Sequence, residues 1–141
     1  MKFLFVVLAF FGLTSCHSFY ISLDSLKQQY SNIDSTSLTE AVIQAPYFKE
    51  KYLANPIRKL KCKDKKGVEI NLEVSPSIEM EITSKNGMNT VFYMDRTMIY
   101  NNKLIGVQSR FPPFLKDEVP LDSIAVIRVQ DGRKKFYYLK R

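Results

Sequence analysis

The sequence predicts an α+β fold that is mostly β, with one or two N-terminal helices followed by an antiparallel β-meander of about eight strands. Apolar residues recur at helical spacing up to residue 54 and alternate with polar residues from Ile57 onward. Turn sequences rich in Gly, Asn and Asp separate the alternating segments, as they do in consecutive hairpins. Because such a meander must close on itself or protect its edge strands, we expect a strongly bent sheet or a small barrel.

The chain begins with a segment typical of exported proteins. Lys2 is followed by uncharged and mostly apolar residues from 3 to 13, which is the pattern of a secretory signal. A helix over this apolar stretch rises only about 16 Å, whereas a membrane span needs roughly 20 residues. We therefore expect residues 1–15 to be a signal peptide that is removed.

The end of this segment carries a more specific pattern, Leu13-Thr14-Ser15-Cys16. It resembles the lipobox of bacterial lipoprotein signal peptides, in which an aliphatic residue and two small residues precede the cysteine that is lipidated. The resemblance implies cleavage before Cys16, a diacylglycerol on its sulfur and a third acyl chain on its new amino group. Because one acyl chain binds a bilayer only marginally, three chains should hold the protein at its membrane.

The same resemblance implies a location in the cell envelope. His17 follows the cysteine, and neither an aspartate nor an acidic run stands there. In a two-membrane bacterium this favours the outer membrane, with the protein facing the periplasm. In a single-membrane bacterium the same signal implies the outer face of the plasma membrane.

The composition limits the partners of the mature chain. Without Lys2, 20 of the 21 basic residues remain against 14 acidic ones, so the mature charge is about +6. A basic surface suits nucleic acid, anionic lipid headgroups or acidic proteins, and export makes nucleic acid unexpected. Of the two cysteines, Cys16 belongs to the lipobox, so Cys62 has no partner for a structural disulfide.

Residues 16–36 are interpreted as the lipidated cysteine and a polar tether, with a short helix near 23–30 where Leu23, Leu26 and Tyr30 recur at helical spacing. Residues 37–141 are predicted to form a single domain. Ser37-Leu38-Thr39-Glu40 matches a capping box, which predicts a helix over 38–54. Asn55-Pro56 should end this helix, and the β-meander follows over 57–140.

The hairpin over 58–74 is the best-determined structural prediction. Asp64-Lys65-Lys66-Gly67 predicts a type I turn followed by a Gly bulge. The resulting register pairs apolar residues with one another and opposite charges with one another, as sheets favour. The expected pairs are Cys62 with Ile70, Leu60 with Leu72, Lys63 with Glu69, and Lys59 with Glu73.

Further hairpins are predicted after residue 75. Asn86-Gly87 suits a two-residue loop, which places Ile82 opposite Val91 and Met80 opposite Tyr93. Asn101-Asn102 predicts a third hairpin over 97–109, because Asn tolerates positive φ. Residues 111–115 contain two prolines and interrupt the sheet. Residues 116–118 are expected to form a charged turn, and residues 121–140 a last hairpin around Asp131-Gly132.

The sequence lacks the residues that most catalytic mechanisms need. The only histidine is His17, beside the expected lipid, so His-dependent nucleophilic catalysis and zinc binding are unexpected, as is any cofactor. Cys62 shares a predicted strand face with aliphatic residues, so we expect an inert core thiol. The carboxylates of Glu79, Glu81 and Asp95 leave one less favoured alternative, a small hydrolase related to glycosidases in its chemistry.

The favoured function is a lipid-anchored, non-catalytic binding or accessory module that meets a protein or an apolar ligand. The alternative is an inhibitor or immunity-like protein that neutralises an envelope-active enzyme, because small lipid-anchored β-domains resemble lysozyme inhibitors in architecture. Exposed basic residues and an aromatic, proline-rich loop are the candidate contacts with a partner or with the membrane. These residues are Lys61, Lys65, Lys66, Phe111, Pro112, Pro113 and Phe114.

Overall fold

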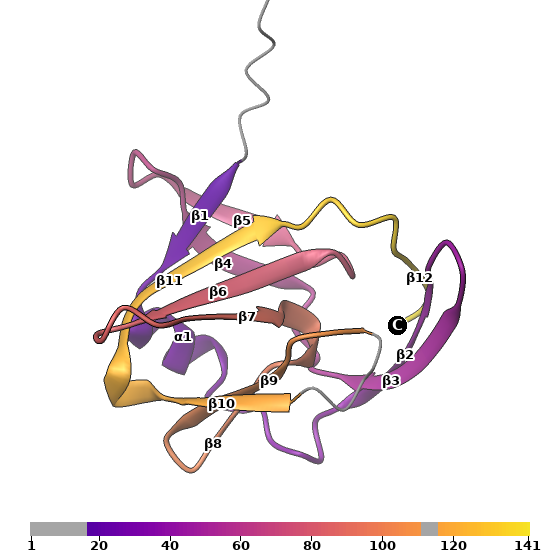
Figure 1. Ribbon diagram of the computed structural model, residues 1–141, viewed down its shortest axis with the longest axis horizontal. Coiled ribbons are helices and arrows are strands. Elements are labelled where there is room, and N and C mark those ends of the chain that lie inside the picture. The colour runs from indigo at the N-terminus through magenta and orange to yellow at the C-terminus, as the bar shows by residue number, and fades with distance from the viewer. Residues whose placement is uncertain (1–16, 111–115) are drawn as a thin grey trace, which may run out of the picture.

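The computed structural model describes residues 17–110 and 116–141, and this part of the chain is mostly β with one α-helix (Figure 1). The helical elements are α1 (Leu23–Gln29) and two single 3₁₀ turns, η1 (Met94–Arg96) and η2 (Leu121–Ser123). The strands are β1 (Ser18–Ile21), β2 (Thr39–Gln44), β3 (Lys49–Ala54), β4 (Lys59–Lys63), β5 (Glu69–Glu73), β6 (Ile78–Ser84), β7 (Asn89–Tyr93), β8 (Met98–Tyr100), β9 (Lys103–Val107), β10 (Lys116–Pro120), β11 (Ile124–Asp131) and β12 (Tyr137–Lys140).

The described strands form three antiparallel sheets, with the orders β5-β4-β1-β11-β6-β7, β10-β9-β8 and β12-β2-β3. The predicted single bent sheet or small barrel is therefore wrong. The order is also not that of a meander, because β1 and β11 lie side by side although they come from opposite ends of the chain (Figure 1). The larger sheet thus depends on contacts that no local pattern specifies.

The segment 16–36 does not form a tether within its described part. Ser18 pairs with Gln130 and Ile21 with Ile127, so β1 is an inner strand of the largest sheet. β11 buries Ile127 and Val129, and β1 and β6 supply the hydrogen-bond partners of its two edges. The short helix appears where it was expected, as α1, and the hydroxyl of Ser22 caps it by accepting from the amide of Ser25 at 3.1 Å. Cys16 lies outside the described residues.

The hairpin of β4 and β5 is confirmed in turn type and in register. The four predicted pairs, including Cys62 with Ile70 and Leu60 with Leu72, are the observed ones. Gly67 has φ +82° and its amide donates to the carbonyl of Asp64 at 3.0 Å, as the Gly bulge requires. A local turn signal flanked by alternating residues was enough to determine this unit.

The register of the hairpin of β6 and β7 differs by one residue from the prediction. Met80 lies opposite Phe92 and Ile82 opposite Thr90. Gly87 occupies the left-handed position of a three-residue loop, closed by Ser84 and Met88, rather than a position in a two-residue loop. This register turns Phe92 into the core, where it is fully buried, whereas the predicted register faced it outward.

The helix predicted over 38–54 is wrong, because these residues form the hairpin of β2 and β3, with Thr39 opposite Ala54. Ala41 and Ile43 are buried while Glu40, Val42 and Gln44, which alternate with them, are half-buried, which is the period of a strand. The hydroxyl of Ser37, expected to cap the helix, instead accepts from the amide of Asp34 within a loop at 3.2 Å. A capping-box match therefore did not outweigh the β-branched residues that follow it.

The remaining hairpin predictions had mixed outcomes. The third hairpin is confirmed by β8 and β9, joined by Asn101 and Asn102 with φ of 49° and 59°. Residues 116–118 form no turn, since they belong to β10, which pairs with β9. The last predicted hairpin is wrong, because β11 and β12 do not pair with each other. β11 pairs with β1 and β6, whereas β12 belongs to the third sheet and pairs with β2.

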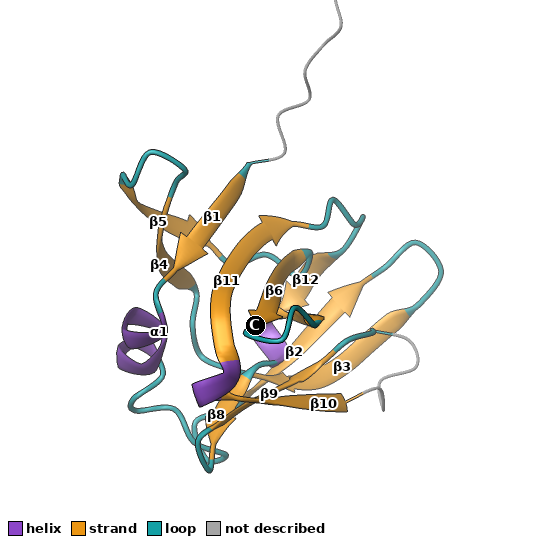
Figure 2. Cartoon of the chain, turned by 60° about the vertical axis from the view of Figure 1, so that its left-hand side comes forward, coloured by secondary structure: helices purple, strands orange, loops and turns teal. Residues whose placement is uncertain are grey.

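The main core lies between the six-stranded sheet, α1 and the sheet of β8 to β10, and Figure 2 shows α1 at one side of the molecule. A smaller cluster on the third sheet contains Ala41, Ile43, Tyr52 and Ala54. Fully buried side chains of the main core are Leu26, Leu60, Met80, Ile82, Phe92, Met94, Leu104 and Val129. The first half of the chain therefore contributes to the same core as the second, in one folded unit.

Candidate functional site

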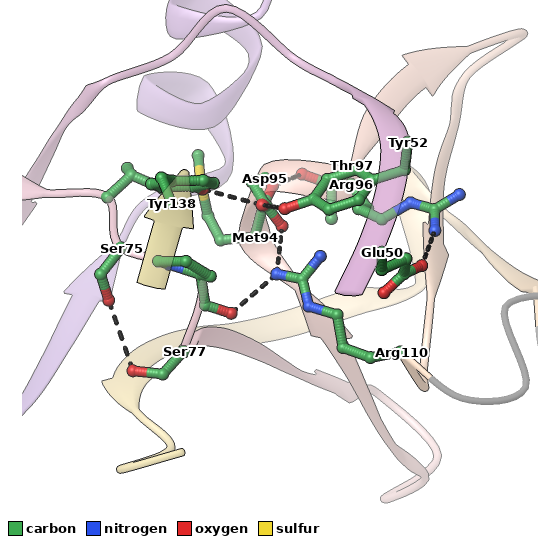
Figure 3. Close-up of polar contacts among 12 residues, drawn as sticks. Glu50, Tyr52, Ser75, Ser77, Met94, Asp95, Arg96, Thr97, Arg110 and Tyr138 are labelled. Atoms are coloured by element: carbon green, nitrogen blue, oxygen red, sulfur yellow. Dashed lines mark hydrogen bonds and ion pairs between the residues drawn. The ribbon is translucent and has the colours of Figure 1, made fainter. Parts of the chain in front are cut away.

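The three sheets meet around a buried ion pair between Asp95 and Arg110 (Figure 3). Asp95 is 1% exposed and Arg110 is 3% exposed. The Nη2 atom of Arg110 donates to Oδ1 of Asp95 at 2.9 Å and to the carbonyl of Pro76 at 2.7 Å. Asp95 lies on η1, which follows the six-stranded sheet, and Arg110 follows β9, so this one pair connects two sheets.

Two tyrosines of the third sheet complete the site. The hydroxyls of Tyr52 on β3 and Tyr138 on β12 both donate to Oδ2 of Asp95, the latter at 2.8 Å (Figure 3). Burial, with the charge of Asp95 in addition, raises the pKa of both hydroxyls, so they stay protonated as donors. The carboxylate therefore accepts hydrogen bonds from residues of two other segments as well as from Arg110.

The guanidinium of Arg110 lies between two aromatic rings. Its central carbon is 4.7 Å from the ring centroid of Tyr52 and 4.3 Å from that of Tyr93. Burial lowers the pKa of Arg110, but the adjacent Asp95 raises it overall, so the guanidinium keeps its charge. Its Nε and Nη1 atoms have no hydrogen-bond partner among the described residues. The rings partly replace these missing bonds through cation–π attraction.

A second set of hydrogen bonds fixes the backbone around Asp95. The amide of Asn55 donates to the carbonyl of Asp95 at 2.8 Å, and its side chain donates to the carbonyls of Met94 at 2.9 Å and Thr97 at 3.0 Å. The hydroxyl of Thr97 also contacts that of Tyr30, just after α1. These bonds hold η1 in one position against β3 and α1.

This arrangement is closed to solvent, which limits what it does chemically. Asp95 has three donors on its carboxylate and no exposed edge from which to meet a bound sugar. Glu81 instead pairs with Arg128 on the six-stranded sheet, and Glu79 lies opposite Gln130. The carboxylates that the sequence suggested for hydrolysis therefore do not line one open cleft, and the buried pair serves to join the sheets.

The other titratable candidate, Cys62, lies in the main core. Its side chain is buried and its sulfur is 3.7 Å from the carbonyl of Ile70, as a weak donor. Burial raises the pKa of the Cys62 thiol, which keeps it protonated and unreactive. Within residues 17–110 and 116–141, no three His, Cys, Asp or Glu side chains are grouped so that they could hold a metal ion.

A hollow of about 470 Å³ lies at the end of the six-stranded sheet where β1 begins. Phe19, Leu72 and Ile78 give it an apolar lining. The polar residues that line it are His17, Glu73, Ser75, Gln130, Asp131 and Arg133. Sequence reasoning missed this hollow, because its lining comes from four segments that meet only in the folded sheet.

The described residues among the predicted contacts are divided between two places. Lys65 and Lys66 are exposed in the turn between β4 and β5. Lys61 faces α1, where the side chain of Gln29 donates to its carbonyl at 3.0 Å and accepts from its amide at 2.9 Å. Phe111, Pro112, Pro113 and Phe114 lie outside the described residues.

The fold and its hollow define a mostly β, three-sheet protein with a concave surface beside its N-terminal strand. No protein-family model, curated protein sequence or solved structure matches the chain. Within the described ranges, no helix is long and apolar enough to span a membrane.

Proposed function

We propose that this protein is a cell-envelope lipoprotein, held at its membrane by lipid on Cys16, that acts as a non-catalytic binding or accessory module. The observation that carries the proposal is the sequence Leu13-Thr14-Ser15-Cys16, with its resemblance to a lipobox. The position of β1 supports it, because Ser18 begins an inner strand only two residues after that cysteine. A lipid on Cys16 would therefore hold the folded domain directly at the bilayer, without a tether.

The binding role is supported by the hollow beside β1. Ligand sites are usually concave and mostly apolar, with a few polar groups that orient the ligand. The hollow is concave and combines three apolar residues, Phe19, Leu72 and Ile78, with polar residues that would orient a ligand. Its position next to the proposed anchor places it where envelope proteins and lipids would reach it.

The anchor is tested by mass spectrometry of the mature N-terminus after expression in a bacterial host. We expect a chain that begins at residue 16 and carries the mass of three acyl chains. Cys16→Ser should abolish this modification and leave the signal segment uncleaved, whereas Cys62→Ser should keep both lipidation and cleavage. A chain that begins at Met1, or an unmodified thiol at position 16, would contradict the proposal.

The binding role is tested by photo-crosslinking in intact envelopes. A photoreactive amino acid in place of Leu72 lies in the wall of the hollow, and the same amino acid in place of the exposed Tyr100 lies at the end of β8, outside the lining of the hollow. We expect a reproducible protein or lipid adduct from position 72 and none from position 100. Equal labelling at the two positions, or no adduct at 72, would count against a ligand in the hollow.

A further inference from the structure

Three loops with exposed basic or aromatic side chains lie at the end of the domain where β1 begins. The first is the turn of β4 and β5. Tyr20 lies opposite Lys63, the last residue of β4, so this turn lies next to the start of β1. The second is the segment after β11, since Ser18 lies opposite Gln130. The third is the turn of β2 and β3, whose Phe48 ring lies 6.4 Å from that of Phe136. Figures 1 and 2 show all three loops along the same upper side of the molecule.

The basic side chains of these loops are free to meet a partner. Lys65 and Lys66 in the first loop are exposed, as are Arg133, Lys134 and Lys135 in the second. None of these five forms an ion pair within the described residues, although the lysines and arginines at 51, 96, 103, 110, 128 and 140 do. Their charges are therefore not neutralised by contact inside the domain.

The aspartates of the first two loops accept hydrogen bonds from backbone amides of their own turns. Oδ1 of Asp64 accepts from the amides of Lys66 at 2.8 Å and Val68 at 2.9 Å, and Oδ1 of Asp131 accepts from the amide of Arg133 at 2.8 Å. Long lysine chains extend further than these short carboxylates, so the ammonium groups are the outermost charges of the loops. The charges of this end that extend furthest into solvent are therefore the basic ones.

The third loop adds an aromatic side chain with no packing partner. Tyr47 is 97% exposed at the tip of the turn between β2 and β3. Tyrosine is enriched at membrane–water interfaces, because its ring is apolar and its hydroxyl stays among the headgroups. Basic side chains and an exposed tyrosine on one side of a domain are the combination that suits an anionic bilayer surface.

We propose that this end of the domain, defined by Lys65, Lys66, Arg133, Lys134, Lys135 and Tyr47, docks on anionic phospholipid headgroups and fixes the orientation of the domain on its membrane. This inference rests on the proposed lipid anchor, since Ser18 of β1 lies at the same end. Docking in this orientation brings the hollow lined by His17, Gln130 and Arg133 to the level of the headgroups.

The test uses vesicle sedimentation of the chain from His17 to Arg141, which contains every described element of the fold. Vesicles of phosphatidylcholine alone are compared with vesicles that contain one-third phosphatidylglycerol. We expect binding only to the anionic vesicles, weakened when NaCl is raised from about 0.1 to 0.5 M. Because each basic residue near the surface contributes up to about 1 kcal/mol, K65Q/K66Q and K134Q/K135Q should each weaken binding by about tenfold.

The matched control removes the same charge elsewhere. K27Q/K85Q changes exposed lysines on α1 and on the turn of β6 and β7, and it should alter binding by less than about twofold. Circular dichroism and thermal unfolding establish that all variants are folded. Equal binding to neutral and anionic vesicles, absence of binding to both, or equal weakening by the control would overturn the proposal. The chain used in this measurement lacks Cys16, so a failure to bind vesicles would not contradict the proposed lipid anchor. An unmodified Cys16 would likewise leave the result of the vesicle measurement unchanged.

Discussion

Asp95→Asn is expected to lower the free energy of unfolding by about 3–5 kcal/mol, because it leaves the buried guanidinium of Arg110 without a counter-charge. Arg110 is 3% exposed, so its charge is removed from water in the folded protein. The substitution also weakens the acceptor for Tyr52 and Tyr138, whose hydroxyls connect the third sheet to η1. The measurement is urea or thermal unfolding followed by circular dichroism.

Two controls separate the buried charge from a general loss of packing. Asp95→Asn combined with Arg110→Met should cost less than Asp95→Asn alone, because the double variant buries no unpaired charge. Glu81→Gln removes a carboxylate paired with the half-exposed Arg128 and should cost less than about 1 kcal/mol. A loss below about 1 kcal/mol for Asp95→Asn would show that the pair does not hold the sheets together.

Phe92→Ala is expected to lower the free energy of unfolding by about 3–5 kcal/mol, the usual cost of emptying a buried aromatic site. Phe92 is fully buried, and its ring fills the space beside Gly106 of β9, where an added Cβ would lie 2.5 Å from the ring. The ring therefore packs the six-stranded sheet against the sheet of β8 to β10. Equilibrium unfolding in urea gives the value.

Val91→Ala is the control for Phe92→Ala, and the comparison of the two variants tests the register of β6 and β7. Val91 is the neighbour of Phe92 on the opposite face, is 36% exposed and lies opposite Glu81. Its truncation should cost less than about 1 kcal/mol. If the strands paired as the two-residue Asn86-Gly87 loop predicts, the two costs would be reversed, because a shift of one residue exchanges the faces.

Hairpins were predicted correctly where the turn residues and the residues next to them are enough to specify the pairing. The hairpin around Asp64 and Gly67 and the one around Asn101 and Asn102 both formed as expected, since their pairs lie within a few residues of the turn. The turn around Gly87 formed one residue out of register, because Asn-Gly is compatible with more than one loop length. The burial of Phe92 then decided between the two registers.

The candidate sites were less predictable than the hairpins. Lys65 and Lys66 were identified as contacts because they are charged residues in a turn, which is a local property. Lys134 and Lys135 could not be identified, because only the pairing of β1 with β11 brings their loop to the same end of the sheet. Asp95 was noticed as a carboxylate, but its partners lie 15 residues away at Arg110 and 43 residues away at Tyr52 and Tyr138.

The sequence by itself determined the mostly β character of the chain, the turns at Gly67 and at Asn101-Asn102, and the inert thiol of Cys62, and it raised the expectation of a lipid anchor. Only the tertiary structure decided that residues 39–54 form two strands, that β11 lies between β1 and β6, and that Asp95 joins the three sheets through Arg110, Tyr52 and Tyr138. The physical reason is that turns and alternation act over a few residues. A strand that is paired on both edges by non-adjacent segments, or a charge that is buried, is stabilised by partners from distant parts of the chain.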